Sequence, residues 1–388
     1  MGRKVGRRYR ESGKASQRIG IDMSAAEHRR AMRGSALGVV VALGFAACSG
    51  SDSDSADTAS VTTLSTEAEA TVPDTTTPAP TVPETTTPAA TAPETTAPET
   101  IEPEPSTSEL DGTTETIAES SAANDELTAD RPYDVFVPTG YDAAAPTPLV
   151  LLLHGYTASG DIQEAYFQFE PLAESRGFLY VHPDGTVDAA GQQFWNATDA
   201  CCAFGGDSPD DAAYVMSIIE QVSAEYNVDP KAVFLAGHSN GGFMSYRMAC
   251  QHADTIAGIA SLAGATFADT ADCAPSEPVS VLQVHGTSDE TIKYDGGSIA
   301  SVDYPSAPQT VQAWVAYNGC DTTPTVTVDA LDLDGGIDGV ESDAETFGGC
   351  EQGSEVELWT IDDGSHTPAI TADFSAGVID FLLAHPKP

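Results

Sequence analysis

Apolar runs alternate with segments of helical periodicity through the C-terminal two thirds of the chain. Continuous apolar runs that end near Gly, such as PLVLLLHG, are typical of strands buried on both faces of a parallel sheet. Strands are predicted over 147–155, 177–185, 231–239, 278–286 and 355–361. Helices are predicted between them over 161–177, 241–253, 307–320 and 375–385. Strict alternation of this kind predicts an α/β fold with a mostly parallel, doubly wound sheet.

One further helix is predicted to open at Ser208. Ser208 is followed by Pro209, Asp210 and Asp211, which resembles a helix N-terminus with a capping side chain and Pro in the first turn. Apolar residues then recur at helical spacing from Val215 onward. The two Asp residues are expected to be structural, with an acidic metal-binding pair as the alternative.

Residues 1–48 have the pattern of an export signal. Arg residues precede the apolar run SALGVVVALGFAA, which is shorter than the roughly 20 residues needed to span a bilayer. The run ends F-A-A-C-S-G, which resembles a bacterial lipoprotein signal in which Cys48 is lipidated and becomes the mature N-terminus. The alternative is ordinary cleavage near Ala47. Either outcome predicts a secreted, extracellular protein, and the first predicts one anchored to the cell membrane by lipid.

Residues 49–128 are dominated by Thr, Pro, Glu, Ala and Ser, with repeats such as T-V-P-E-T-T-T-P. Such a segment buries too little apolar surface to offset the entropy of ordering, so we expect a disordered linker. A single folded α/β domain is therefore expected over 129–388. That region holds 39 acidic and six basic side chains, a net charge near −33. Nucleic acid is excluded as a partner because phosphates require a basic face, and we expect a monomer.

The pentapeptide Gly237-His238-Ser239-Asn240-Gly241 matches the G-x-S-x-G nucleophile elbow. A predicted strand runs into Ser239 and a predicted helix follows it at once, which is the turn that lifts a Ser hydroxyl above the sheet. The context therefore predicts Ser239 as a catalytic nucleophile.

A serine nucleophile needs a base and an acid that orients the base, and here the chain order is Ser, Asp, His. Asp289 follows directly after the strand 278–286 and is preferred to Asp295. His366 lies in the loop between the strand 355–361 and the last helix, where the base is expected. Asp289 and His366 are therefore predicted to complete a triad with Ser239.

The tetrahedral intermediate of such a reaction needs backbone N–H donors for its oxyanion. One is expected from Asn240, directly after the nucleophile, and the other from Tyr156 in the loop H-G-Y-T-A-S-G. His154 is expected to anchor that loop. Acyl transfer by this machinery requires no cofactor and no metal.

Six cysteines remain when Cys48 is set aside, an even number in an exported protein, so disulfides are expected. We predict that Cys320 pairs with Cys350, closing the loop before the strand that leads to His366, and that Cys250 pairs with Cys273. Cys201 and Cys202 then remain as an adjacent pair. Metal binding is the alternative, but the spacing lacks a matching C-x-x-C pair with His.

The motifs L-L-L-H-G, W-x-x-x-x-x-C-C, G-H-S-N-G-G-F-M, V-H-G-T-S-D and W-V-A-Y-N-G-C together resemble the polyhydroxybutyrate depolymerase and feruloyl esterase family of secreted bacterial α/β-hydrolases. The resemblance covers 131–385 and implies Ser239, Asp289 and His366 as the triad. Members often carry G-G-H-x-W-P-G around the histidine, whereas this chain has D-G-S-H-T-P-A. The Trp that would contact substrate there is missing.

Trp195 is the candidate for an aromatic substrate contact, with a buried structural role as the alternative. The acidic segment DLDGGIDG hints at calcium through Asp332, Asp334 and Asp338, but a full ligand series ending in a bidentate Glu is missing.

The sequence thus predicts a secreted serine esterase of the α/β-hydrolase fold that hydrolyses carboxylic esters of hydroxyalkanoate oligomers or polyester through an acyl-enzyme. A feruloyl or acetyl-xylan esterase is the alternative within enzymes. A surface-binding protein on an inactive hydrolase scaffold is the alternative outside them. Small or oligomeric esters are expected as substrates.

Overall fold

The computed structural model describes residues 126–206 and 208–388. The predicted export signal, Cys48 and nearly all of the predicted linker lie outside these residues. Within them, no helix has the length and apolar character that crossing a bilayer requires.

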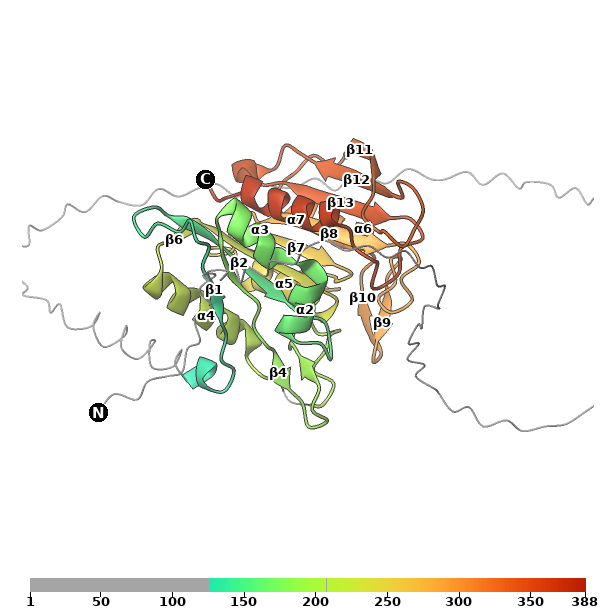
Figure 1. Ribbon diagram of the computed structural model, residues 1–388. Helices are drawn as coiled ribbons and strands as arrows, with labels where there is room; N and C mark the ends of the chain where they lie inside the picture. The colour runs from blue at the N-terminus through green and yellow to red at the C-terminus, as the bar shows by residue number, and fades with distance from the viewer. Residues whose placement is uncertain (1–125, 207) are drawn as a thin grey trace, which may run out of the picture. The chain divides into compact units, whose positions relative to one another are not determined.

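A nine-stranded sheet forms the centre of the domain (Figure 1). Its order is β1 (Val135–Phe136), β3 (Leu179–Val181), β2 (Thr147–Leu153), β6 (Val228–His238), β7 (Gly258–Leu262), β8 (Ser280–Gly286), β13 (Val356–Ile361), β12 (Ser342–Phe347) and β11 (Thr325–Leu331). The six strands from β3 to β13 pair in parallel, and β1, β12 and β11 add antiparallel edges. The predicted α/β class and mostly parallel sheet are confirmed.

Helices cover both faces of the sheet, and the side chains of β2 show why. Leu149, Leu151 and Leu153 point into the core shared with α4 (Asp211–Glu225), α5 (Asn240–Gln251) and α6 (Ala307–Tyr317). Val150 and Leu152 point into the opposite core with α2 (Gly160–Phe167), α3 (Phe169–Arg176) and α7 (Ala372–Ala384). Because successive strand residues face opposite ways, a continuous apolar run is what a sheet covered on both faces requires.

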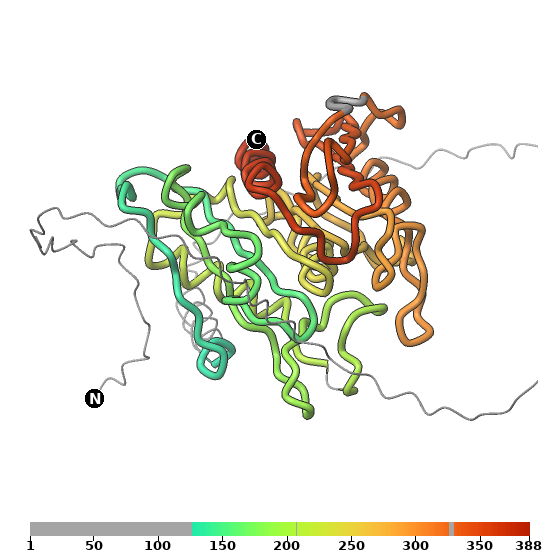
Figure 2. The backbone as a smooth tube through the Cα atoms, turned by 45° about the vertical axis from the view of Figure 1, so that its right-hand side comes forward, coloured from blue at the N-terminus to red at the C-terminus, as the bar shows by residue number. Residues whose placement is uncertain are grey.

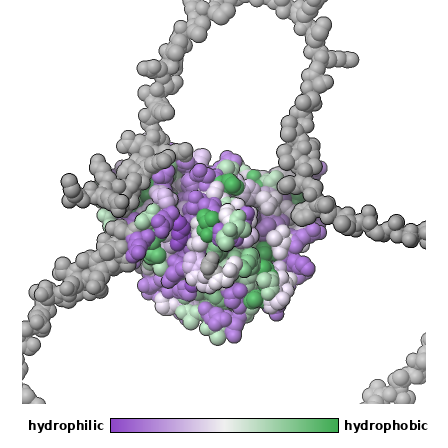
Figure 3. All heavy atoms as spheres, turned by 90° about the horizontal axis from the view of Figure 1, so that it is seen from below, coloured by the Kyte–Doolittle hydropathy of each residue, from purple (hydrophilic) through white to green (hydrophobic). Residues whose placement is uncertain are grey.

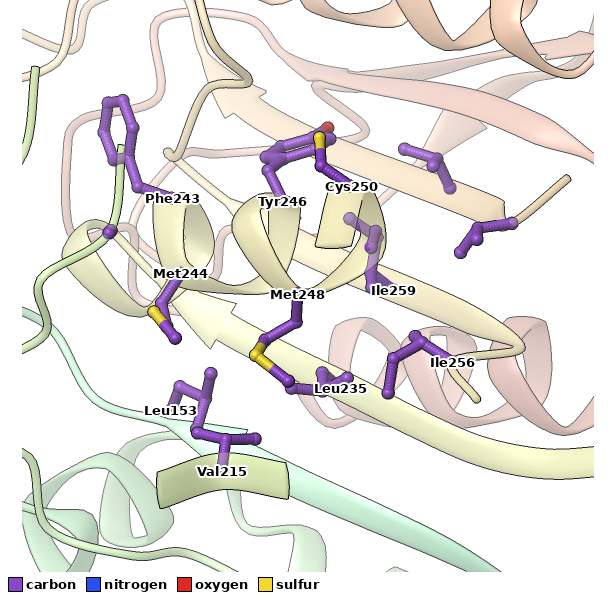
Figure 4. Packing of buried hydrophobic residues seen from close by; sticks show 14 of the residues in the cluster. Leu153, Val215, Leu235, Phe243, Met244, Tyr246, Met248, Cys250, Ile256 and Ile259 are labelled. Atoms are coloured by element: carbon purple, nitrogen blue, oxygen red, sulfur yellow. The ribbon is translucent and has the colours of Figure 1, made fainter. Parts of the chain in front are cut away.

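Helix α5 packs directly on the middle of the sheet. Figure 4 shows Met244 and Met248 directed from the helix towards Leu153, Leu235 and Val215. All five side chains are completely buried. The helix that follows the predicted nucleophile is therefore held rigidly by the core beneath it.

The helix predicted over 161–177 is broken in two, which corrects the sequence prediction. Gln168 takes a left-handed conformation (φ 54°, ψ 46°), and the Glu164 carboxylate accepts hydrogen bonds from the backbone N–H groups of Phe169 and Glu170. In one continuous helix, Phe167 and Phe169 would face roughly opposite ways. The break lets both rings enter the same core, where their centroids lie 5.3 Å apart.

The helix predicted to open at Ser208 begins three residues later, because Asp210 is its N-cap and accepts from the N–H of Ala213 at 3.0 Å. Asp211 is completely buried and receives hydrogen bonds from Arg131 (2.5 Å), Thr186 Oγ1 (2.9 Å) and the N–H of Asn196 (2.7 Å). Both carboxylates are thus engaged in fixing the fold.

Several short strands escaped the sequence analysis. They are β1, β7, β11, β12 and two hairpins, β4 (Thr186–Val187) with β5 (Gln193–Phe194) and β9 (Gly297–Ile299) with β10 (Val302–Tyr304). Figures 1 and 2 show both hairpins projecting beyond the same end of the sheet.

Three disulfides have the predicted partners: Cys250 with Cys273, Cys320 with Cys350, and Cys201 with Cys202. The first fastens the end of α5, and the second joins the turn after α6 to the turn before β13.

Replacing Asp211 by Asn should lower the free energy of unfolding by about 3 kcal/mol, because Arg131 would lose a buried partner. Asp380→Asn is the matched control: its ion pair with Arg176 is exposed on both sides, so its loss should cost at most about 1 kcal/mol. Urea unfolding followed by circular dichroism measures both. Equal losses would contradict a special role for the buried pair.

Candidate active site

Ser239 lies in the tight turn between β6 and α5. Its backbone has φ 53° and ψ −118°, outside the regions that residues with a side chain normally occupy. Gly241 passes so close to the carbonyl of Leu153 that a Cβ there would clash, and a Cβ on Gly237 would clash with the carbonyl of Gly241. The N–H of Ser239 donates to the carbonyl of Leu262 at the end of β7 (2.8 Å). The two flanking glycines of the elbow are therefore required by close backbone approach.

The structure brings Ser239, His366 and Asp289 together from three loops that are far apart in the sequence. His366 Nε2 lies 3.0 Å from Ser239 Oγ, and His366 Nδ1 lies 2.7 Å from Asp289 Oδ2. Asp295, the rejected alternative for the acid, has no such contact with His366 among the described residues. The chain of contacts runs from carboxylate to imidazole to hydroxyl, which is the order that general-base activation of a serine needs.

Asp289 is held in its ionised form. Burial alone would raise the pKa of this carboxyl, but hydrogen bonds from His285 and His366 and from the N–H of Ile292 outweigh it and lower the pKa well below the usual range. His285 Nε2 lies 3.4 Å from Asp289 Oδ2 and also donates to the carbonyl of Ile292 (2.7 Å). The negative charge that orients His366 is therefore present at all but strongly acidic pH.

The loop after β2 lies against Ser239. A Cβ built on Gly155 would lie 3.6 Å from the Cβ of Ser239. Thr157, which has a positive φ of 69°, donates its N–H to the carbonyl of Gln193 (2.8 Å) and so turns the loop at Tyr156. Within the described residues, the backbone N–H groups of Tyr156 and Asn240 have no acceptor. Both predicted donors are thus available to a ligand.

His154 anchors this loop, as the sequence analysis expected. Its Nδ1–H donates to the carbonyl of Gly155 (2.8 Å), and its Nε2 accepts from the N–H of Gly185 (2.8 Å). Burial lowers the pKa of His154, which favours the neutral ring that this pair of contacts requires.

Trp195 has the buried structural role that the sequence analysis gave as the alternative, and the predicted substrate contact is wrong. The side chain is completely buried, its Nε1–H donates to the carbonyl of His154 (3.0 Å), and its ring stacks on Tyr214 with centroids 6.3 Å apart. An indole whose donor and faces are all engaged supports the loop from behind and offers nothing to a substrate.

The side chain of Asn240 ties the nucleophile turn to the segment of Trp195. Its Oδ1 accepts from the N–H of Trp195 (2.7 Å), and its Nδ2 donates to the carbonyl of the same residue (2.9 Å). The same Nδ2 lies 3.5 Å from Cys201 Sγ. Asn240 therefore fixes the segment that carries the Cys201–Cys202 disulfide while its own backbone N–H remains available.

An aromatic pair that sequence reasoning missed lies beside the predicted oxyanion loop. Phe204 is 49% exposed and meets Tyr156 edge to face, with ring centroids 5.3 Å apart. The only signal in the sequence is an apolar residue isolated between Cys202 and two glycines. The exposed ring next to Tyr156 is therefore a candidate substrate contact.

Among the acidic residues considered as metal ligands, Asp334 has other partners, and so does the neighbouring Glu341. Asp334 Oδ1 accepts from the N–H groups of Gly336 and Ala369, and the carboxylate of Glu341 accepts from the N–H groups of Leu333 and Asp334. Across residues 126–206 and 208–388, no three potential metal ligands lie together in a suitable group. Within that range, the structure thus gives no support for a calcium site at Asp332, Asp334 and Asp338.

Comparison with known proteins points to esterases. The family model described as Esterase PHB depolymerase matches residues 131–345, more than half of the chain, and so includes Ser239 and Asp289 but not His366. The chain is 28% identical over 237 residues to feruloyl esterase B of Piromyces equi, covering 59% of this chain and 41% of that protein. It is 32% identical over 169 residues to the bifunctional acetylxylan esterase/xylanase XynS20E of Neocallimastix patriciarum, covering 44% and 23%.

Among solved structures, an acetyl xylan esterase from Aspergillus awamori matches with a TM-score of 0.45 and 16% identity, covering 64% of this chain and 93% of that one. The chain spans less than half the length of either relative named above.

The depressed pKa of Asp289 predicts how its contribution to stability depends on pH. The folded state binds the proton less readily than the unfolded chain, so the stabilisation is fully present above the ordinary carboxyl pKa of about 4 and is lost as the pH falls towards the folded value. Asp289→Asn removes this ionisation. The difference in unfolding free energy between wild type and variant should therefore shrink between pH 6 and pH 3. A constant difference in urea unfolding would contradict this.

Proposed function

Since the chain belongs to the Esterase PHB depolymerase family, we propose that it is a serine hydrolase of carboxylic esters, with Ser239 as nucleophile, His366 as base and Asp289 as the acid that orients it. The family resemblance predicted from the sequence is confirmed, and with it the α/β-hydrolase fold. The observation that carries the proposed mechanism is the unbroken contact from Asp289 through His366 to Ser239, with distances of 2.7 and 3.0 Å.

In the first half of the reaction, His366 Nε2 accepts the proton of Ser239 Oγ as the oxygen attacks the ester carbonyl carbon. The carbonyl oxygen becomes an oxyanion, which the N–H groups of Tyr156 and Asn240 would stabilise. The negative charge of Asp289 stabilises the imidazolium without taking its proton. The C–O bond to the alcohol then breaks, and His366 returns the proton to the departing oxygen, leaving an acyl-enzyme.

In the second half, water takes the place of the alcohol. His366 removes a proton from the water as it attacks the acyl carbon, the same two N–H groups hold the oxyanion, and the proton returns to Ser239 Oγ as the acid is released. No cofactor enters either half.

An ester with an aromatic acyl group, such as a feruloyl ester, is the second candidate substrate beside hydroxyalkanoate esters. The exposed ring of Phe204 next to Tyr156 favours it. A relative covering 59% of the chain is named a feruloyl esterase, which agrees with this assignment. Figure 3 views the molecule from the end where both hairpins project and shows hydrophobic patches between hydrophilic side chains.

We place the protein outside the cell. Three disulfides persist in oxidising compartments and are rare in the cytosol, and residues 1–48 have the sequence of an export signal. Lipidation at Cys48 would anchor the enzyme to the membrane surface.

Ser239→Ala should abolish hydrolysis of p-nitrophenyl acetate while leaving the protein folded. Removal of such a nucleophile costs about 10⁶-fold in turnover, so the residual rate should fall below about a hundredth of wild type. Circular dichroism of the variant checks the fold. Hydrolysis that persists after the change would rule out Ser239, and wild type without any esterase activity would support the inactive binding scaffold instead.

Phe204→Ala should reduce kcat/KM for methyl ferulate by about threefold to tenfold, the range expected for one lost aromatic pair, and should leave methyl butyrate nearly unchanged. Val340→Ala is the matched control, because Val340 is also an exposed apolar side chain (63%) but lies on the segment before β12. An equal loss on both esters would show that Phe204 does not select the acyl group.

A further inference from the structure

His238, the residue before Ser239, connects the nucleophile turn to the loop that carries the base. We propose that His238 is a positioning residue: its Nε2–H holds the main-chain carbonyl of His366 and thereby fixes the His366 imidazole relative to Ser239 Oγ. The inference rests on the serine mechanism proposed above and adds a residue to it that never touches the substrate.

The contact joins two segments 128 residues apart. His238 Nε2 lies 2.9 Å from the carbonyl oxygen of His366, and the two imidazole rings pack with centroids 5.0 Å apart at 40°. His238 is the last residue of β6, where it pairs with Leu262 of β7, so its backbone is fixed by the sheet. The ring is buried and meets Tyr166 edge to face at 5.7 Å. The end of a strand thus reaches across to the loop that carries the base.

The partner atom determines which ring nitrogen of His238 carries the proton. A carbonyl oxygen can only accept, so Nε2 must hold the hydrogen, and a neutral ring then leaves Nδ1 without one. Burial and the neighbouring His366 lower the pKa of His238 to about 4. The titratable groups facing it are His366, Asp289, His285 and Tyr166, and Asp289 is the carboxylate among them.

The neutral state matters because His366 becomes positively charged during catalysis. A second positive ring 5.0 Å away would oppose that charge. A neutral His238 supplies a donor to the backbone without this penalty, which an Arg or Lys could not do.

Other contacts hold the backbone of the loop beyond His366, but they do not involve the backbone of His366. Tyr166 donates its hydroxyl to the carbonyl of Pro368 (2.6 Å), and the N–H of Ala369 donates to Asp334 (2.8 Å). Among the described residues, His238 is the one whose side chain forms a hydrogen bond with the His366 backbone. Loss of its donor should therefore leave the loop attached while the base shifts over Ser239, so catalysis should suffer more than folding.

The test compares His238→Gln with His238→Asn in the full-length protein. The amide nitrogen of Gln lies near the position of Nε2, whereas that of Asn lies near Nδ1 and cannot reach the carbonyl. Since a displacement of about 1 Å can cost up to 10²-fold in rate, we expect kcat on p-nitrophenyl acetate to fall about tenfold or more in H238N. KM should stay within about twofold, and H238Q should recover kcat to within about threefold of wild type.

His252→Asn serves as the control for loss of a histidine outside the site, and thermal melting checks each fold. If H238N does not fold, H238L carries the same expectation, because Leu fills the space without a donor. Equal kcat in the Gln and donor-less variants, whether both high or both low, would overturn the proposal. So would a change in KM alone. Ser239→Ala, measured in parallel, separates a failure of the serine mechanism from a failure of the positioning role. Activity that survives in Ser239→Ala refutes the serine mechanism, whatever the His238 variants show.

Discussion

The positive φ of Ser239 is the constraint on which the active-site geometry depends. A residue with a side chain in this conformation costs on the order of 1–3 kcal/mol and persists only where its surroundings determine it. Here the N–H of Ser239 donates to the carbonyl of Leu262, and Gly241 packs closely against the carbonyl of Leu153. Met244 and Met248 fix α5 in the core. The strain is thus supported by strands β2, β6 and β7 and by helix α5.

Three consecutive residues in this turn each reach a different part of the chain. His238 contacts the backbone of His366, Ser239 contacts the imidazole of His366, and Asn240 clamps Trp195. A change in the angle between β6 and α5 would therefore move the base, the nucleophile and the oxyanion loop together. Because one turn makes all three contacts, the relative positions of the site residues can be well defined although the site is assembled from loops.

Much of this could be predicted from the sequence, because the chemistry follows local signals. The elbow, Asp289 and His366 each lie in the turn or loop after a predicted strand, and those strands are recognisable from their largely apolar residues. The break at Gln168 could not be predicted, because its cause is a contact of Glu164 with Phe169 and the common core of two rings. The role of Trp195 was equally hidden, since a buried and a substrate-binding indole have the same local pattern. Phe204 lies in an irregular segment where periodicity says nothing.

The clamp between Asn240 and Trp195 holds only part of the segment that follows Trp195. Trp195 and Cys201 are fastened to the nucleophile turn, whereas the four residues after Cys202, Ala-Phe-Gly-Gly, carry the exposed ring and form no regular element. Mutation in that short stretch can exchange the ring for a smaller or polar side chain without disturbing the strained turn. The exposed ring and the strained turn are thus held by separate contacts, so the side chain next to Tyr156 can change in size or polarity while the turn keeps its geometry.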